Sequence, residues 1–265
     1  MQPMLVASSS YRASYLARVF SMAVALLPLG AWGSETNWLD VESRIQYGYY
    51  TEDPRALAGV MELLAPAEPE SATRHYYAGL ANYRLTQLSA TRDKGRAKET
   101  AEACVDNLDQ AVKIQKAKNL EQDSADALAL ESACLDLLAG LEAWRAPFAA
   151  SRSGSQIEKA RHLGPKNPRV LLLDAVGVYE RPKASAADNA RALQGFKAAA
   201  AAFEAERRDN EHVPGWGAAE AYVYLAKCQL DRGATLEARD ALERALLIAP
   251  ELAEARRLMK KITSG

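Results

Sequence analysis

The stretch that decides the fold lies near the C-terminus, where residues 219–250 read AEAYVYLAKCQLDRGATLEARDALERALLIAP. Small and large apolar residues recur in it at helical spacing, and two helices separated by a glycine are the simplest structure that pairs them. The small residues would let the helices approach closely, and the large ones would fill the seam. Gly233 would close the first helix and Pro250 would end the second. The paired residues are Ala226, Ala238, Ala245, Tyr222, Leu225 and Leu242.

The same residues carry a family resemblance. Counted from Ala219, the aromatic, leucine, small, glycine and proline positions follow the order of the tetratricopeptide repeat (TPR), a helical hairpin of ~34 residues. Residues 219–250 therefore closely resemble a TPR, and residues 72–111 resemble one fairly well. The resemblance implies a recognition scaffold built from stacked hairpins.

Working back along the chain, we find the same register four more times. The hairpins would start at Trp38, Ala72, Ser124 and Asn167, and the second would have an enlarged polar loop between Ser89 and Lys98. A last amphipathic segment, residues 251–262, would cover the end of the stack. We therefore predict an all-α fold: a right-handed α-solenoid of about five degenerate TPR-like hairpins with a C-terminal capping helix. An irregular bundle of long buried helices is the alternative.

The N-terminus has the pattern of an export signal. Arg12 and Arg18 precede an apolar run at residues 19–29, and Ala31-Trp32-Gly33 leaves small residues where a signal peptidase cuts. The run is shorter than the ~20 residues of a membrane span, so we expect no integral span. We predict a signal peptide at residues 1–33, a single repeat domain at 34–265 and a periplasmic location. An uncleaved N-terminal anchor is the alternative.

Charge and cysteine content narrow the classes of function. The chain has 33 basic and 34 acidic residues, a balance that does not suggest nucleic acid as a partner. Its three cysteines are Cys104, Cys134 and Cys228. In an oxidising compartment a bridge between the first two is possible, and three buried free thiols are the equal alternative.

The sequence offers no catalytic constellation. His75, His162 and His212 do not stand at the spacing of a metal site, and no glycine-rich phosphate loop or nucleophile elbow occurs. The cysteine spacings match neither a redox pair nor a zinc site. We therefore expect no enzyme activity, no cofactor and no metal.

The TPR resemblance implies a concave groove lined by the first helix of each hairpin. At the corresponding positions this chain is rich in tyrosine, which offers apolar contact and a hydrogen-bonding tip at small entropic cost. The predicted groove residues are Tyr49, Tyr76, Tyr77, Tyr83, Arg84, Leu172, Val176, Tyr179, Tyr224 and Lys227.

Two functions remain open from the sequence. The first is a periplasmic scaffold or adaptor that binds a protein or extended peptide in this groove. The second is a subunit that binds a small apolar ligand, similar to the TPR-type periplasmic components of some solute transporters. A continuous cavity of ~300 Å³ or more around Leu172, Val176 and Tyr179 would favour the ligand.

Overall fold

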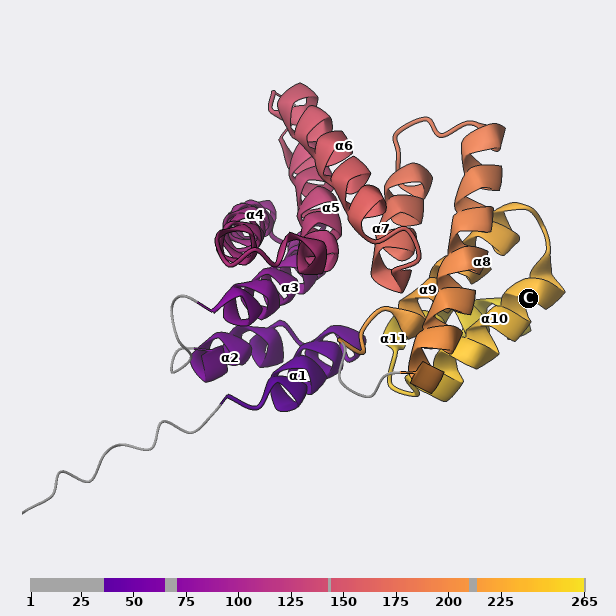
Figure 1. Ribbon diagram of the computed structural model, residues 1–265. Coiled ribbons are helices and arrows are strands. Elements are labelled where there is room, and N and C mark those ends of the chain that lie inside the picture. Colours follow the sequence, from indigo (N-terminus) through magenta and orange to yellow (C-terminus); the bar gives the residue numbers. More distant parts are fainter. Residues whose placement is uncertain (1–35, 65–70, 143, 210–213, 265) are drawn as a thin grey trace, which may run out of the picture. The chain divides into compact units, whose positions relative to one another are not determined.

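The computed structural model is all-helical over the part of the chain that it describes, and it contains no strand there (Figure 1). The predicted all-α stack of helical hairpins is therefore confirmed. Contacts group the chain from Glu35 to Gly265 into one compact unit. The predicted signal peptide lies outside the described residues, which are 36–64, 71–142, 144–209 and 214–264.

Consecutive helices pair into five hairpins, and one further helix follows them. Each hairpin consists of two helices joined by a short turn, and neighbouring hairpins pack through their first helices or through successive helices. The hairpins are α1 (Trp38–Tyr50) with α2 (Pro54–Leu64), α3 (Ala72–Ser89) with α4 (Lys94–Ala117), α5 (Ala125–Leu141) with α6 (Ala146–Leu163), α7 (Pro168–Tyr179) with α8 (Ala186–Asp209), and α9 (Ala218–Asp231) with α10 (Thr235–Ile248). A 3-10 turn, η1 (Glu121–Ser124), precedes α5, and α11 (Ala253–Thr263) ends the chain.

The fifth hairpin has the packing that its sequence predicts. Ala226, Ala238 and Ala245 are fully buried at the interface of α9 and α10, and Leu242 is buried beside them. Gly233 adopts a φ of 74° in the turn. Glycine adopts this left-handed conformation without strain, whereas the Cβ of another residue would clash with the backbone.

The second hairpin corrects one expectation. The predicted enlarged loop between Ser89 and Lys98 is wrong, because α4 begins at Lys94 and the turn spans only residues 90–93. The Asp93 side chain accepts a hydrogen bond from the Arg96 backbone N–H at 3.0 Å, which caps the helix. A polar sequence can therefore start a helix here, with Gly95 tolerated in its first turn.

The two helices of this hairpin approach very closely at Gly79. A Cβ placed on Gly79 would lie 2.6 Å from Cγ of Leu108, well inside van der Waals contact. Only glycine leaves room for the leucine, which is itself fully buried.

A disulfide joins consecutive hairpins. Cys104 on α4 bonds to Cys134 on α5, with their Cα atoms 6.2 Å apart, and both side chains are fully buried. Cys228 is a buried free thiol, and burial raises its pKa to about 11. Of the two alternatives that the sequence leaves open, the structure has the bridge.

The last helix packs on the fifth hairpin. Ala255 of α11 is fully buried, and Leu252 just before the helix is 3% exposed, so the apolar side of α11 covers the end of α10. Throughout the described ranges, every helix is too short or too polar to cross a lipid bilayer.

Candidate partner-binding surfaces

Side chains from α1, α3 and the start of α9 meet in a buried polar group that we call the interior cluster. Its members come from the first, second and fifth hairpins, so the cluster joins parts of the chain that are far apart in sequence. The interior cluster consists of Glu42, Tyr50, Tyr76, Tyr77, Arg84, Trp216 and Glu220, all at most 8% exposed.

An ion pair between Arg84 and Glu220 lies at the centre of the interior cluster. The two residues are 136 positions apart, and their side chains are 5% and 6% exposed. Tyr50 donates its hydroxyl to the other oxygen of the Glu220 carboxylate at 3.1 Å. A buried charge is tolerated only when it is paired and hydrogen-bonded, and both conditions hold here.

Aromatic rings surround the Arg84 guanidinium. Its central carbon lies 4.0 Å from the ring centre of Tyr49, 5.2 Å from that of Trp216 and 5.3 Å from that of Tyr83. Burial alone would lower the pKa of Arg84, but Glu220 and the neighbouring tyrosines outweigh it and raise that pKa. Arg84 is therefore charged, and its faces are already occupied by rings of its own chain.

Glu42 holds the segment before α9. Its carboxylate accepts hydrogen bonds from the Tyr77 hydroxyl at 2.9 Å and from the Gly215 backbone N–H at 2.5 Å. Burial raises the pKa of Glu42, although these donors act in the opposite direction. Close by, Trp216 donates its indole N–H to the Tyr76 hydroxyl at 2.7 Å.

The structure divides the ten predicted groove residues into two sets. Partner binding by these residues stays a prediction. Both sets are engaged with side chains of the same chain rather than left open to solvent. The buried set is Tyr76, Tyr77, Tyr83, Arg84 and Leu172, and the partly buried set is Tyr49, Val176, Tyr179, Tyr224 and Lys227.

The partly buried set shows how these contacts are made. Tyr179 donates its hydroxyl to Asp231 at 2.7 Å, and Tyr224 stacks on Phe196 with ring centres 5.3 Å apart. Lys227 pairs with Glu254 of α11 at 2.5 Å. A partner would have to displace these contacts before it could use the same side chains.

Sequence reasoning missed the two residues that close the interior cluster. Glu220 looks like an ordinary acidic residue in the first turn of a helix, and Trp216 stands between two glycines in a turn. Their position in the sequence was the available signal. Trp216 directly precedes the best-matching repeat and Glu220 lies in its first turn, on the side that packs toward earlier hairpins. Their partners, Arg84 and Tyr76, lie more than a hundred residues upstream.

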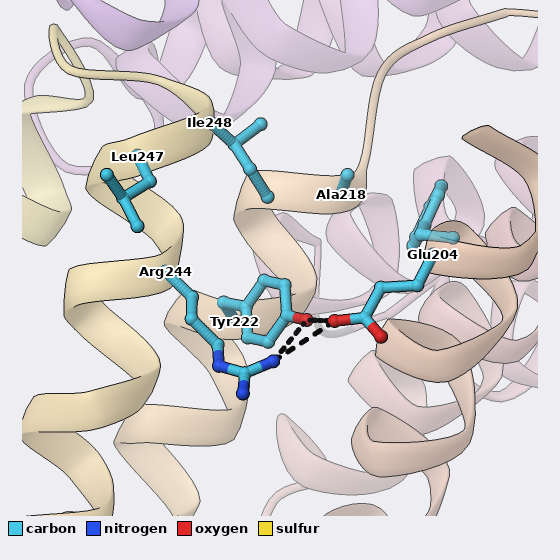
Figure 2. A pocket seen from close by; sticks show the side chains of 7 residues that line it. Glu204, Ala218, Tyr222, Arg244, Leu247 and Ile248 are labelled. Atoms are coloured by element: carbon cyan, nitrogen blue, oxygen red, sulfur yellow. Dashed lines mark hydrogen bonds and ion pairs between the residues drawn. The ribbon is translucent and has the colours of Figure 1, made fainter. Parts of the chain in front are cut away.

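A second surface, open to solvent, lies where α8, α9 and α10 meet (Figure 2). We call it the α8–α10 groove. It comprises a hollow of about 140 Å³ and a neighbouring one of about 370 Å³, which share Glu204, Tyr222 and Arg244. The smaller hollow is also lined by Phe203, Ala218, Leu247 and Ile248, and the larger by Lys197, Ala200, Ala201, Leu225, Gln229, Glu237, Asp240 and Ala241.

The smaller hollow is mainly apolar. Phe203, which forms part of its lining, is only 3% exposed, whereas Leu247 is 83% exposed and Ile248 is 37% exposed. Figure 2 shows Leu247 and Ile248 on the same helix end above Tyr222. Leu247 and Ile248 together with the hollow form a contiguous exposed apolar surface, and such surfaces are a feature of contact sites.

Polar groups fix the boundary between the two hollows. The Tyr222 hydroxyl donates to Glu204 at 2.5 Å, and the Arg244 guanidinium donates to the same carboxylate oxygen at 3.1 Å (Figure 2). Burial, together with the hydrogen bond to Glu204, raises the pKa of Tyr222. Tyr222 is therefore held as a neutral donor between the two hollows.

The hollows do not coincide with the ligand cavity that the sequence allows. Besides the two in the α8–α10 groove, a third of about 470 Å³ is lined by residues at the start of α4 and by Asn82 of α3. None of these three is lined by Leu172, Val176 or Tyr179. In the described ranges, no group of His, Cys, Asp and Glu side chains is arranged to hold a metal ion.

Comparisons with known proteins add little. No protein-family model matches the chain, and no curated protein matches it. Among solved structures, it is similar to a chain in the crystal structure of the APC/C hetero-tetramer Cut9–Hcn1, at 12% identity and a TM-score of 0.24. The match covers 86% of this chain and 53% of that one, so this chain spans about half the length of the solved chain. A TM-score this low does not establish a common fold.

Proposed function

We propose that this protein is an exported scaffold that binds a segment of another protein in the α8–α10 groove. The observation that carries the proposal is the exposed Leu247 at the mouth of an apolar hollow floored by Phe203. A partner's apolar side chain inserted there would bury both surfaces at once, which is how anchor residues supply most of the binding energy at interfaces.

The rim of the groove indicates the charge of the partner. Three exposed charged residues without an ion pair to any described residue line the larger hollow, namely Glu237, Asp240 and Lys197, so unpaired carboxylates outnumber unpaired cations there. Arg244, by contrast, is already paired with Glu204. We therefore expect the bound segment to combine an apolar anchor with basic residues, because opposite charges at the rim steer association.

The proposed location is the periplasm. It is supported by the export pattern in residues 1–33 and by the Cys104–Cys134 bridge, since disulfides persist in oxidising compartments. Intact-mass measurement of the protein recovered from the periplasm should give a chain that starts near Ser34. A full-length chain in that fraction would rule out cleavage.

Site-specific cross-linking in cells tests the binding surface. A photoreactive amino acid placed at Leu247 should give a covalent adduct with one envelope protein, identified by mass spectrometry. The same amino acid at Leu236, which is 76% exposed on α10 but does not line the groove, is the matched control and should give none. Equal adducts at both positions, or an adduct only at Leu236, would contradict the proposed site.

A further inference from the structure

Two large aromatic side chains project into solvent at the turn between α5 and α6, which lies at the top of the view in Figure 1. Trp144 is 69% exposed and Phe148 is 79% exposed, whereas Phe196, Phe203 and Trp216 are buried. We call residues 144–148 the aromatic turn. A folded chain rarely leaves two such rings uncovered within five residues unless they meet another surface.

The Trp144 ring is held in position by contacts with its own chain. The Arg145 guanidinium lies 4.8 Å from the ring centre of Trp144 and pairs with Glu102 at 2.5 Å and with Glu142 at 3.2 Å. The hydrogen bond from Lys98 and the charge of Arg145 lower the pKa of Glu142, so its carboxylate is charged and anchors the turn. The aromatic turn is thus presented by a network of ion pairs.

Basic side chains lie at the same end of the molecule. Lys98 near the start of α4 pairs with Glu142 at 2.8 Å, which places the turn between α3 and α4 beside the aromatic turn. In that turn and the first residues of α4, Arg92, Lys94 and Arg96 are exposed and form no ion pair with any described residue. The two acidic residues among them are Asp93, whose carboxylate caps α4, and Glu99.

We propose that the aromatic turn and these three cations form a docking surface for a lipid bilayer that contains anionic lipid. Tryptophan and phenylalanine insert at the level of the lipid headgroups, and neighbouring basic residues are attracted to anionic lipid. This inference does not rest on the proposed function, because the two surfaces share no residue.

The geometry favours a bilayer over a protein at this site. Anchor residues of a protein interface usually cluster with well-packed pockets on both partners. None of the three hollows described above is lined by Trp144 or Phe148, so these rings have no such pocket beside them. The rings instead stand on a projecting turn with cations beside them, an arrangement that suits a flat, deformable surface.

Vesicle sedimentation tests the docking surface. The whole exported chain is mixed with vesicles of phosphatidylcholine alone or of equal parts phosphatidylcholine and phosphatidylglycerol. We expect binding to the anionic vesicles, weakened about tenfold or more by the double change Trp144→Ala and Phe148→Ala. Arg92→Gln with Lys94→Gln should reduce binding to anionic vesicles about tenfold and leave the phosphatidylcholine result unchanged.

A matched variant and a direct readout complete the test. Leu39→Ala with Leu236→Ala removes two other exposed apolar side chains, 63% and 76% exposed, and should leave binding unchanged. Brominated lipid should quench wild-type tryptophan fluorescence and quench the Trp144→Phe variant clearly less. No binding to anionic vesicles, equal loss of binding in the Trp144→Ala/Phe148→Ala and Leu39→Ala/Leu236→Ala variants, or equal quenching of the wild type and Trp144→Phe would overturn the proposal. So would a Trp144→Ala/Phe148→Ala variant that binds anionic vesicles as tightly as the wild type.

Discussion

At the scale of single residues, Arg84 joins parts of the chain that are far apart in sequence. Its charge is buried, paired with Glu220 and enclosed by the rings of Tyr49, Tyr83 and Trp216. Such a pair contributes little if both partners are replaced together by apolar residues of similar size, but removing one partner leaves the other buried and uncompensated.

We therefore expect Arg84→Met to lower the free energy of unfolding by about 3 to 5 kcal/mol, measured by urea denaturation. The control is Arg44→Ala, which breaks an exposed pair with Asp40 and should cost about 1 kcal/mol or less. Similar small losses in both variants would mean that Arg84 is not buried against Glu220.

The second residue-scale prediction concerns Glu42 and pH. Because burial raises the pKa of Glu42 above 4.5, the folded protein holds this proton to higher pH than the unfolded chain does. The carboxyl therefore contributes stability at low pH that is lost as the pH rises through the folded pKa. Relative to wild type, the stability of Glu42→Gln should improve between about pH 4 and pH 7.

Asp188 provides a control of opposite sign. Hydrogen bonds from Ser185 lower the pKa of Asp188, so its contribution is present at neutral pH and lost on acidification. Relative to wild type, Asp188→Asn should become less stable as the pH rises from about 2 to about 5, because the contribution of Asp188 appears in that range. Denaturation curves in which both variants move in the same direction would contradict these assignments.

At the scale of helices, close approach explains why small residues stand where they do. Gly79→Ala would push a Cβ into Leu108 of the facing helix and should destabilise the protein by about 1 to 3 kcal/mol. Gly59→Ala on α2 meets nothing within 4 Å and should instead stabilise by about 0.5 to 1 kcal/mol. Thermal melts that move in the same direction for both variants would show that α3 and α4 are packed differently.

The disulfide belongs to the same scale, because it joins α4 to α5. It closes a loop of 30 residues, and the chain-entropy estimate for that length is about 3 to 4 kcal/mol. We expect the double change Cys104→Ser and Cys134→Ser to lose about that much stability. Thiol titration of the unfolded, unreduced wild type should find one free thiol, at Cys228, and three would eliminate the bridge.

Sequence reasoning succeeded at this scale where the determinants are local. The fifth hairpin follows from Ala226, Gly233 and Leu242, because each acts on residues one or two turns away. The turn before α4 was mispredicted, because a polar stretch was interpreted as a loop although Asp93 caps a helix within it. The polar composition of this stretch fits both a loop and the start of a helix, and the hydrogen bond from the Arg96 N–H to the Asp93 side chain favours the helix.

At the scale of the whole molecule, the sequence could not predict how the helix faces are covered. The register correctly placed Tyr76, Tyr83 and Arg84 on the first helix of a hairpin, but their burial depends on Trp216 and Glu220 far along the chain. Local periodicity does not encode which distant residue covers a face. The α8–α10 groove was missed for the same reason, because three helices are needed to form it.

The proposed function requires a protein partner to bind the α8–α10 groove rather than the helix face that includes Lys227 and Tyr179. The most direct measurement is isothermal titration calorimetry. The partner identified by cross-linking is purified and titrated into variants of this protein whose circular dichroism spectra match that of the wild type. We predict that Leu247→Asp weakens binding about tenfold or more, whereas Leu236→Asp, Lys227→Ala and Tyr179→Phe leave it within about twofold. Unchanged binding by Leu247→Asp together with weakened binding by Lys227→Ala or Tyr179→Phe would contradict the account.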